Sequence, residues 1–266
     1  MSATDFPLSS RALDRLAAEG RSIAFWWRDD DARVPTPALD RLTGLARHHD
    51  LPLALAVIPD GAGPALAEHL AGDGRLSILL HGHSHANHAP ANEKRAEFGD
   101  HRPGDAMAAE IAAGRAKLEN LFGGCFMPVF VPPWNRIGET ARFLLPTLGL
   151  PVLSVYGRAR PPLAGQPFEL NTHLDIMDWR AMGGLSLEEA DERLSKLIEA
   201  RADVTLDNGA GPEPVGVLTH HLQHDKAAWS LIEVLFDRLA SHSAVSWPDL
   251  KDLLPTHCGQ SLILPS

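Results

Sequence analysis

Histidine is concentrated in two short windows of this 266-residue sequence. The chain has 14 histidines. Seven of them fall in these windows, which hold His81, His83, His85 and His88, then His220, His221 and His224. Imidazole is the commonest metal-binding side chain, and it also changes charge near neutral pH. The two clusters therefore predict metal binding or proton transfer.

The first cluster directly follows an apolar run that ends at Leu80. His81 and His85 are four residues apart, and Gly82 allows the backbone to turn between them. His81 and His83 are two apart, which would place them on one face of an extended strand. Either pair could bind a divalent cation together with a carboxylate, because two histidines and one carboxylate form a known catalytic metal set.

Three adjacent carboxylates, Asp29, Asp30 and Asp31, end the first apolar run of the chain. Like charges packed together are unfavourable, so a positive group should compensate them. A metal ion shared with the first histidine cluster would supply that charge.

Two further run ends carry candidate groups. Pro132 and Pro133 lack N–H donors, so the next amide, that of Trp134, is free to point at a ligand. His220 follows the run Val215–Leu218 and suits a general acid. Successive residues of a strand point to opposite faces, so we expect His220 rather than His221 to face the site.

The elements that must position these groups follow an alternating pattern. Continuous apolar runs, typical of strands buried on both faces, are Ile23–Trp27, Leu53–Ile58, Leu76–Leu80, Val129–Val131, Val152–Val155, Phe168–Leu170 and Val215–Leu218. Stretches with helical periodicity lie between them, at Thr36–His48, Pro64–Ala71, Asp105–Leu121, Glu139–Leu148, Leu187–Arg201 and Lys226–Leu239. Some seven such units favour a closed or nearly closed α/β barrel over an open sheet.

Composition limits the possible classes of function. With 24 Lys+Arg against 34 Asp+Glu, the net charge of −10 argues against nucleic-acid and membrane partners. The longest apolar stretch, Leu51–Pro59, is under half of the ~20 residues that span a bilayer. The first 20 residues lack the pattern of a signal peptide. We therefore expect a soluble, cytoplasmic protein without a nucleic-acid or membrane partner.

Five motifs, in this order, resemble those of the polysaccharide deacetylase family (NodB-homology, carbohydrate esterase family 4). The matching segments are Asp29-Asp30, His81-Gly82-His83-Ser84-His85, Pro132-Pro133-Trp134, Asp175–Trp179 and Leu218-Thr219-His220. The resemblance runs from residue 22 to about residue 250. It implies a distorted (β/α)7 TIM-like barrel in a single domain, 1–266, with residues 1–20 as a peripheral segment that we expect to be helical.

The resemblance also implies roles for individual residues. Asp29 would be the catalytic base, and Asp30, His81 and His85 would bind one divalent ion, zinc first, with cobalt or nickel as alternatives. The Trp134 N–H would stabilise the oxyanion, and His220 would be the general acid. Asp178 would hold His220 or a nearby arginine in place. The residues expected to line the substrate groove are Pro133, Trp134, Asn135, Trp179 and His221.

The sequence departs from the family pattern at three positions. Gly82 stands where Ser or Thr is usual. Val131 stands where the family has an arginine paired with the fourth motif's aspartate, and Arg136 and Arg180 are the candidates to replace its charge. Asp31 stands where glycine is usual, so the functional pair could instead be Asp30 and Asp31.

The predicted reaction is metal-dependent hydrolysis of a carbon–nitrogen bond in a non-peptide amide, namely removal of an acetyl group from an N-acetylated sugar or a related substrate. Two alternatives remain open. A cyclic imide or ureide hydrolase would use the same carbonyl chemistry, and a carbohydrate-binding relic would have lost catalysis. The intact carboxylates and histidines argue against the relic, because a relic has no physical need to keep costly charges together.

Overall fold

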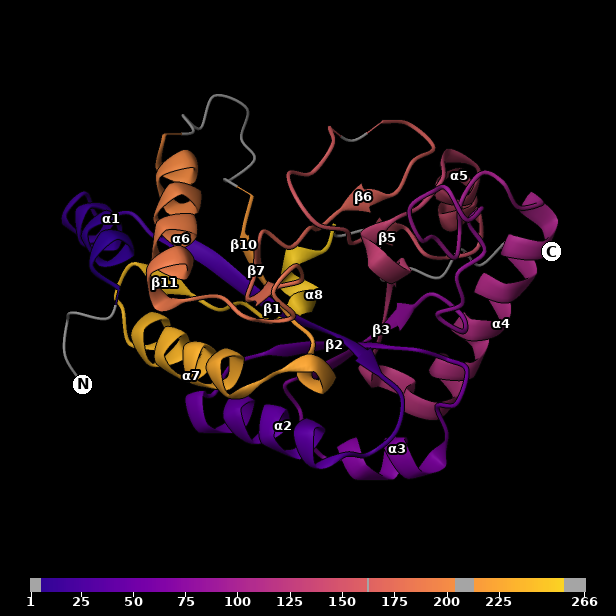
Figure 1. The fold of residues 1–266 in the computed structure, drawn as a ribbon, viewed down its shortest axis with the longest axis horizontal. Helices are drawn as coiled ribbons and strands as arrows, with labels where there is room; N and C mark the ends of the chain where they lie inside the picture. The colour runs from indigo at the N-terminus through magenta and orange to yellow at the C-terminus, as the bar shows by residue number, and fades with distance from the viewer. Residues whose placement is uncertain (1–5, 162, 204–212, 256–266) are drawn as a thin grey trace.

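A parallel β-sheet forms the centre of the molecule (Figure 1). The computed structural model describes residues 6–161, 163–203 and 213–255. The strands are β1 (Ile23–Ala32), β2 (Leu53–Val57), β3 (Leu76–His81), β4 (Phe126–Val131), β5 (Val152–Leu153), β6 (Phe168–Glu169), β7 (Leu174–Asp175) and β10 (Val215–Thr219). They are arranged in the order β6-β5-β4-β3-β2-β1-β10-β7, and each neighbouring pair is parallel.

The two ends of this sheet, β6 and β7, belong to one stretch of chain, residues 168–175. Its first half pairs with the β5 side, where the Leu170 amide donates to the Leu153 carbonyl at 3.0 Å. Its second half pairs with β10, where the His173 amide donates to the Gly216 carbonyl at 2.7 Å. The stretch therefore joins β5 to β10 and closes the sheet, which confirms the expected distorted (β/α)7 barrel.

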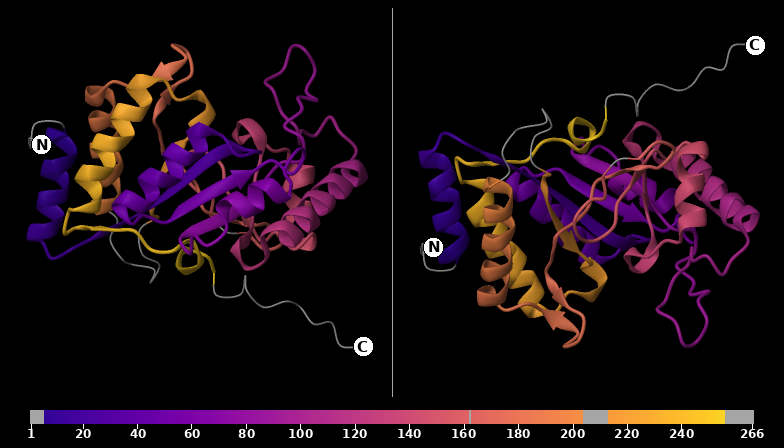
Figure 2. Two further views of the ribbon diagram at one scale, coloured as in Figure 1. Left: turned by 90° about the horizontal axis from the view of Figure 1, so that it is seen from below. Right: turned by 90° about the horizontal axis from the view of Figure 1, so that it is seen from above.

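Helices cover the outside of the sheet (Figure 2). They are α1 (Pro7–Ala18), α2 (Pro37–His49), α3 (Pro64–Leu70), α4 (Gly104–Phe122), α5 (Glu139–Thr147), α6 (Leu187–Ala202) and α7 (Lys226–Ala240). Their starts follow capping chemistry: the Thr36 hydroxyl accepts from the Leu39 amide, and Ser186 and Glu189 form a capping box. Each helix predicted from periodicity is present within one or two residues of its expected bounds.

Smaller elements complete the fold. A two-stranded hairpin, β8 (Met177–Asp178) and β9 (Gly183–Gly184), follows β7, and β11 (Val245–Ser246) pairs with the start of β1. Leu250 of α8 (Leu250–Leu253) belongs to the apolar cluster inside the barrel. These pieces were not predicted, because elements of two to four residues without an apolar run carry no readable hydrophobic period.

Alternation along β1 decides which side chains reach the barrel interior. Trp26 belongs to the inner apolar cluster, whereas the Trp27 ring packs against Phe236 of α7 with centroids 4.6 Å apart. The side chains of residues 28 and 30 point to the same face as Trp26, and that of residue 29 points to the same face as Trp27. The inner face of β1 therefore carries Arg28 and Asp30 towards its carboxyl end, and Asp29 faces the helices.

The expected peripheral helix is α1, which lies beside α6 at one edge of the molecule (Figures 1 and 2). The Asp191 carboxylate of α6 accepts from the Leu8 and Ser9 amides, each at 2.8 Å, and from the Ser9 hydroxyl at 2.6 Å. A side chain of another helix thus caps α1. Among the described residues, no helix combines the length and the apolar character that crossing a bilayer would need.

Candidate metal and acid–base site

Three ligand atoms meet at the carboxyl ends of β1 and β3. Oδ1 of Asp31 lies 3.1 Å from Nε2 of His81 and 3.2 Å from Nε2 of His85. A tetrahedral zinc ion bonded at ~2.0–2.2 Å holds neighbouring ligand atoms ~3.3–3.5 Å apart. The two carboxylate–imidazole separations are slightly below that value, and all three ligand atoms lie within 4.8 Å of one another. The donor set of two imidazoles and one carboxylate fits a divalent transition-metal ion.

The surroundings of His81 and His85 also favour binding of a metal ion. Nδ1 of His81 lies 3.0 Å from the Val131 carbonyl, which also accepts from the Gly82 amide at 3.0 Å. A proton on Nδ1 satisfies that carbonyl and leaves the Nε2 lone pair free to bind a metal. His85 has a left-handed φ of 61°, and its ring packs on Trp134 with centroids 4.4 Å apart.

The carboxylate of this group corrects the sequence prediction. Asp30 was expected to join His81 and His85, but the structure places Asp31 there. The placement of Asp31 beside His81 and His85 matches the alternative register, Asp30 and Asp31, that the extra aspartate had left open.

A β-bulge is the physical reason for the shift. β1 advances three residues from Asp29 to Ala32, while the partner strand β2 advances only two, from Leu55 to Val57. The extra residue breaks the alternation, and Asp31 takes a φ of 75°. This turn directs the Asp31 carboxylate to the histidines of β3.

Asp30 is instead paired with a fully buried arginine of its own strand. Arg28 Nε lies 2.8 Å from Asp30 Oδ1, and Nη2 donates to Oδ2 at 3.0 Å. The guanidinium also donates to the Ser154 hydroxyl and to the Asn135 side-chain carbonyl, each at 2.7 Å. Asn135, expected to line the substrate groove, therefore holds this arginine.

Arg28 is the buried arginine of this region, and it was not among the residues predicted from the sequence. It pairs with Asp30 of the first motif, whereas the family's arginine pairs with the fourth motif's aspartate. The two predicted replacements lie elsewhere: Arg136 donates to the Arg95 carbonyl, and Arg180 is exposed on the β8–β9 turn. A usable signal was present, because an arginine inside an apolar strand must find a partner when it is buried.

Asp29 and His221 form a separate pair on the outer side of β1. His221 Nδ1 lies 2.5 Å from Asp29 Oδ1, and Oδ2 accepts from the Thr219 hydroxyl at 2.6 Å and the His221 amide at 3.0 Å. Both side chains are buried. The predicted roles of Asp29 as base and His221 as a groove residue do not fit this position, because both face away from the barrel interior.

Each member of this pair shifts the pKa of the other. Burial alone would raise the pKa of Asp29, but the His221 charge and the hydrogen bonds of His221 and Thr219 outweigh it and lower that pKa. Burial alone would lower the pKa of His221, but the Asp29 charge and hydrogen bond outweigh it and raise that pKa. Both shifts favour the ionised form of the pair.

His220 lies on the same side as Asp30. Its Nε2 is 3.8 Å from Asp30 Oδ2, and its ring meets the Trp179 ring edge-on with centroids 4.7 Å apart. Its buried Nδ1 has no hydrogen-bond partner among the described residues. The alternation rule that favoured His220 over His221 therefore agrees with where the structure puts the two side chains.

The aspartate near His220 is Asp175, not Asp178. The Asp178 carboxylate accepts from the Arg180 and Ala181 amides and so closes the β8–β9 turn. Asp175 accepts from Trp179 Nε1 at 2.7 Å; burial raises its pKa, and the charge of His220 opposes that rise. Asp178 therefore does not hold His220 or an arginine in place.

The turn after β4 presents a backbone amide. The Asn135 and Arg136 amides donate to the carbonyls of Pro132 and Pro133, at 3.0 and 3.2 Å. Trp134 has a left-handed φ of 57°, and its own amide is the one in this turn without an acceptor among the described residues. Pro133, expected in the groove, is buried.

A second buried acid supports the histidine loop. The Glu97 carboxylate accepts from the Ser84 amide at 2.8 Å, the Ser84 hydroxyl at 2.9 Å and the His83 amide at 3.1 Å. Gly82 has a φ of 56°, and a Cβ there would overlap both Glu97 and the Pro133 ring. This contact explains why glycine replaces the usual Ser or Thr.

The sequence matches no protein-family model and no curated protein. Solved structures do resemble the fold. A Mycobacterium smegmatis protein described as a polysaccharide deacetylase shares 16% identity at a TM-score of 0.64, over 88% of this chain and 89% of that one.

Two enzymes of carbohydrate esterase family 4 give similar results. The Streptomyces lividans enzyme, solved with acetate, shares 14% identity at a TM-score of 0.52, over 85% of this chain and 90% of its own. The Clostridium thermocellum acetyl xylan esterase, solved with a cobalt ion, shares 15% identity at a TM-score of 0.52, over 86% and 89%. The chain therefore has the fold of the polysaccharide deacetylases, as its motifs had indicated.

Proposed function

We propose that the protein is a divalent-metal-dependent hydrolase that removes the acetyl group of an N-acetylated sugar or a closely related amide. The observation that carries this proposal is one arrangement of groups. A metal-binding triad, Asp31, His81 and His85, lies beside a buried carboxylate, Asp30, and an imidazole, His220, that faces it. The structures solved with acetate and with cobalt on the same fold support it.

The triad would hold the metal. A bound divalent ion would supply Lewis-acid activation of water and of the amide carbonyl at neutral pH. Co-ordination by two neutral imidazoles and one carboxylate suits zinc, cobalt or nickel better than magnesium or calcium.

The chain's own groups would move the protons. Asp30 accepts a proton from the attacking water, and Arg28 fixes the orientation of its carboxylate. The Trp134 amide donates to the oxygen that gains charge as the carbonyl carbon becomes tetrahedral. His220 then protonates the nitrogen as the carbon–nitrogen bond breaks, because an expelled amide anion would be too basic. Water and the amide are thereby converted to acetate and a free amine.

The rim of the site fits a saccharide. The Trp179 side chain is 42% exposed while its ring stays fixed against His220 and its Nε1 stays bound to Asp175. An indole that is both rigid and exposed offers a flat apolar face, which suits the apolar face of a pyranose ring. The proposal therefore retains Trp179 as a substrate-binding residue.

The test is acetate release from N-acetylglucosamine oligomers by protein loaded with zinc, cobalt or nickel. Asp31→Ala should lose the metal, because the site would be one ligand short. Asp30→Asn should keep the metal and lose ~10²–10⁴ in kcat/KM, because an amide cannot accept the proton. Asp178→Asn is the matched control and should leave both properties unchanged.

Three outcomes would contradict the proposal. Metal loss in Asp30→Asn with retention in Asp31→Ala would restore the original ligand assignment. Turnover of a cyclic imide with none of the N-acetylated sugars would favour the imide hydrolase. A metal-loaded protein that binds the oligomers and hydrolyses neither substrate would be a relic.

A further inference from the structure

A second group of ligand-type side chains lies at the opposite end of the barrel from the catalytic site. α2 leaves the carboxyl end of β1 and ends before β2, and it runs beside α7 (Figure 1). His48 and His49 are in the last turn of α2, and Asp237 is in the last turn of α7. The three ligand atoms lie within 4.8 Å of one another, and His49 Nε2 is 3.7 Å from Asp237 Oδ1.

These side chains border an open cavity of about 380 Å³ between the two helices. Arg41 and Glu233 line the same cavity, and they already form an ion pair at 2.8 Å. Arg41 also lies over the Trp229 ring, 4.4 Å from its centroid. Glu233 therefore has a permanent cation as its partner.

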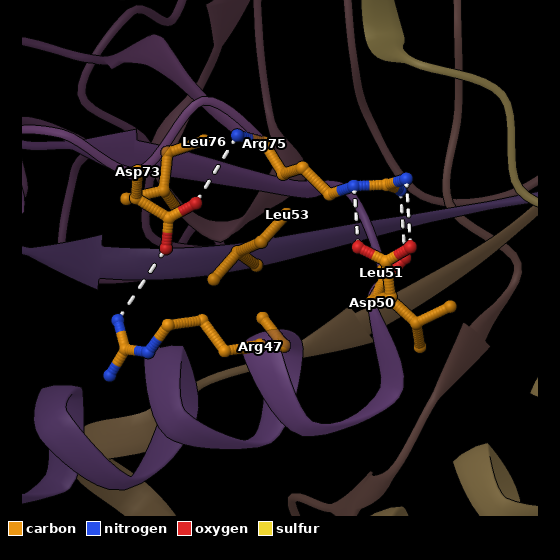
Figure 3. A pocket seen from close by; sticks show the side chains of 8 residues that line it. Arg47, Asp50, Leu51, Leu53, Asp73, Arg75 and Leu76 are labelled. Atoms are coloured by element: carbon orange, nitrogen blue, oxygen red, sulfur yellow. Dashed lines mark hydrogen bonds and ion pairs between the residues drawn. The ribbon is translucent and has the colours of Figure 1, made fainter.

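In the neighbouring cavity, on the other side of α2, the carboxylates are likewise paired with arginines (Figure 3). There, Asp50 pairs with Arg75 at 2.8 Å, and Asp73 lies 3.5 Å from Arg47. Asp237 is different. Within the described residues it pairs with no lysine or arginine, and only imidazole faces it.

The two imidazoles supply the other ligand atoms. A histidine binds a metal through the lone pair of a ring nitrogen, and Nε2 of His49 already faces Asp237 Oδ1. The C-terminal turns of α2 and α7 also place the negative ends of two helix dipoles here, which favours a cation.

We propose that His48, His49 and Asp237 form a second divalent-cation site, of the zinc class, which ties the end of α2 to α7. Two imidazoles and one carboxylate select zinc, copper or nickel over calcium and magnesium. The ligand atoms would have to close to ~3.4 Å for tetrahedral binding. The exposed His48 ring can make this adjustment by rotating about its side-chain bonds. The site needs no catalytic group, so it stands or falls independently of the proposed reaction.

The experiment is a calorimetric zinc titration of the full-length His81→Ala variant, in which the catalytic triad is one ligand short. We expect this variant still to bind one zinc ion per chain and to gain thermal stability from it, because a ligand that binds only the folded state stabilises it. Adding His48→Ala should abolish both effects. His48 is exposed, so this second change should leave folding intact.

A matched imidazole–carboxylate pair gives the control. His69 lies 2.8 Å from Asp40, but among the described residues no third ligand joins them, so His69→Ala in the same background should leave zinc binding unchanged. Asp237→Asn should weaken binding at least about tenfold. The proposal is overturned if His81→Ala binds no zinc, or if either His48→Ala or Asp237→Asn leaves its zinc affinity unchanged.

Discussion

Three adjacent aspartates on β1 occupy three different environments. Asp29 faces the helical layer and pairs with His221, and Asp30 faces the barrel interior and pairs with Arg28. Asp31 lies on a bulge against His81 and His85, the histidines of the candidate metal site. The chemical type is the same at each position. Strand alternation and one extra residue are therefore enough to separate a structural carboxylate, a candidate base and a candidate ligand.

The Asp29–His221 pair should contribute to stability over a defined pH range. The lowered pKa of Asp29 gives a contribution that is present above its unfolded pKa, ~3.9, and is lost as the pH falls through the folded pKa. The raised pKa of His221 gives a contribution that is present below ~6.5 and is lost as the pH rises through the folded pKa. The stabilisation is therefore greatest between about pH 4 and pH 6.5.

His221→Ala should lower the free energy of unfolding by ~3–5 kcal/mol in that range, because it leaves Asp29 buried without its partner. The deficit should shrink at higher pH, where wild-type His221 loses its proton. His221→Gln is the control, since its amide can donate to Asp29 without a charge, and it should lose less. Urea unfolding at several pH values measures both variants. A deficit independent of pH would show that the pair is not ionised.

Arg28 should act through Asp30 rather than on the substrate. Arg28→Lys keeps the charge but cannot reproduce the planar fork that contacts Asp30, Ser154 and Asn135 together. We expect kcat to fall by ~10–10² while KM and zinc content stay near the wild-type values, because orientation of a reacting group is lost.

The matched control for Arg28 is Arg136→Lys, a change at the arginine that the sequence had suggested for this role. It should leave kcat unchanged, because Arg136 contacts the Arg95 backbone and not Asp30. A change in KM alone for Arg28→Lys would show that Arg28 binds substrate instead.

At the residue scale, the sequence predicts which face of a strand a side chain takes where strict alternation holds. It does not predict the face where a bulge breaks the alternation. His220 and His221 directly follow β10, and their side chains still lie on opposite sides, beside Asp30 and Asp29 respectively. The bulge at Asp31 has no sequence signal of its own, so the ligand moved by one residue. Asp29 and Trp27 are two residues apart on one strand, which predicts that they share a face. The family pattern instead implied that Asp29 is the catalytic base.

At the scale of elements, the loop after β3 depends on buried polar contacts rather than on regular structure. Residues 82–103 contain no helix or named strand, yet Glu97 and Phe98 are fully buried. Phe98 forms a β-bridge with Ile137, and the Asp100 carboxylate accepts from the first amides of α5. The loop is thus fixed at several points, and Glu97 is the point nearest to the metal-binding histidines.

Glu97→Ala should therefore weaken zinc binding without touching a ligand. It removes three hydrogen bonds from the loop that presents His85, and we expect a ~10–100-fold loss of affinity, the range for groups that support metal ligands. Glu97→Gln keeps the shape and one accepting oxygen, so its loss should be smaller. Competition with a coloured chelator measures both affinities. Equal affinity in all three proteins would contradict the positioning role.

Helices were easier to predict than strands for a physical reason. Each predicted helix has a periodic apolar face, and three of them also begin with a capping side chain, that of Thr36, Ser186 or Asp225, so their bounds follow from local chemistry. β1 extends to Ala32, well beyond its apolar run, because parallel partners on both sides hold its polar residues in the strand. β7 to β9 are set by tertiary pairing alone.

At the scale of the whole molecule, the candidate catalytic groups and some of the elements that stabilise the fold lie in different places. The carboxyl ends of β1, β3 and β10 carry the candidate catalytic groups, and α8 contributes Leu250 to the apolar cluster that fills the interior. Stability depends on elements that lie away from this site, and α1 is the clearest example. It precedes the barrel in sequence and packs against α6, whose Asp191 supplies the cap that Phe6 cannot.

Asp191→Ala should therefore loosen α1 and leave catalysis unchanged. The carboxylate is buried and satisfies two amides and one hydroxyl at a helix N-terminus, so its loss should cost ~1–3 kcal/mol in the free energy of unfolding. Asp191→Asn, which still accepts through one oxygen, should lose less. The control is Asp14→Ala on the exposed face of α1, where a pair with His242 contributes little.

Thermal unfolding measures the stability of each variant. Limited proteolysis should cleave Asp191→Ala between α1 and β1 first and leave the barrel intact, because α1 contacts no residue of the candidate site. A wild-type cleavage pattern and melting temperature in Asp191→Ala would show that packing, rather than this cap, holds α1 in place.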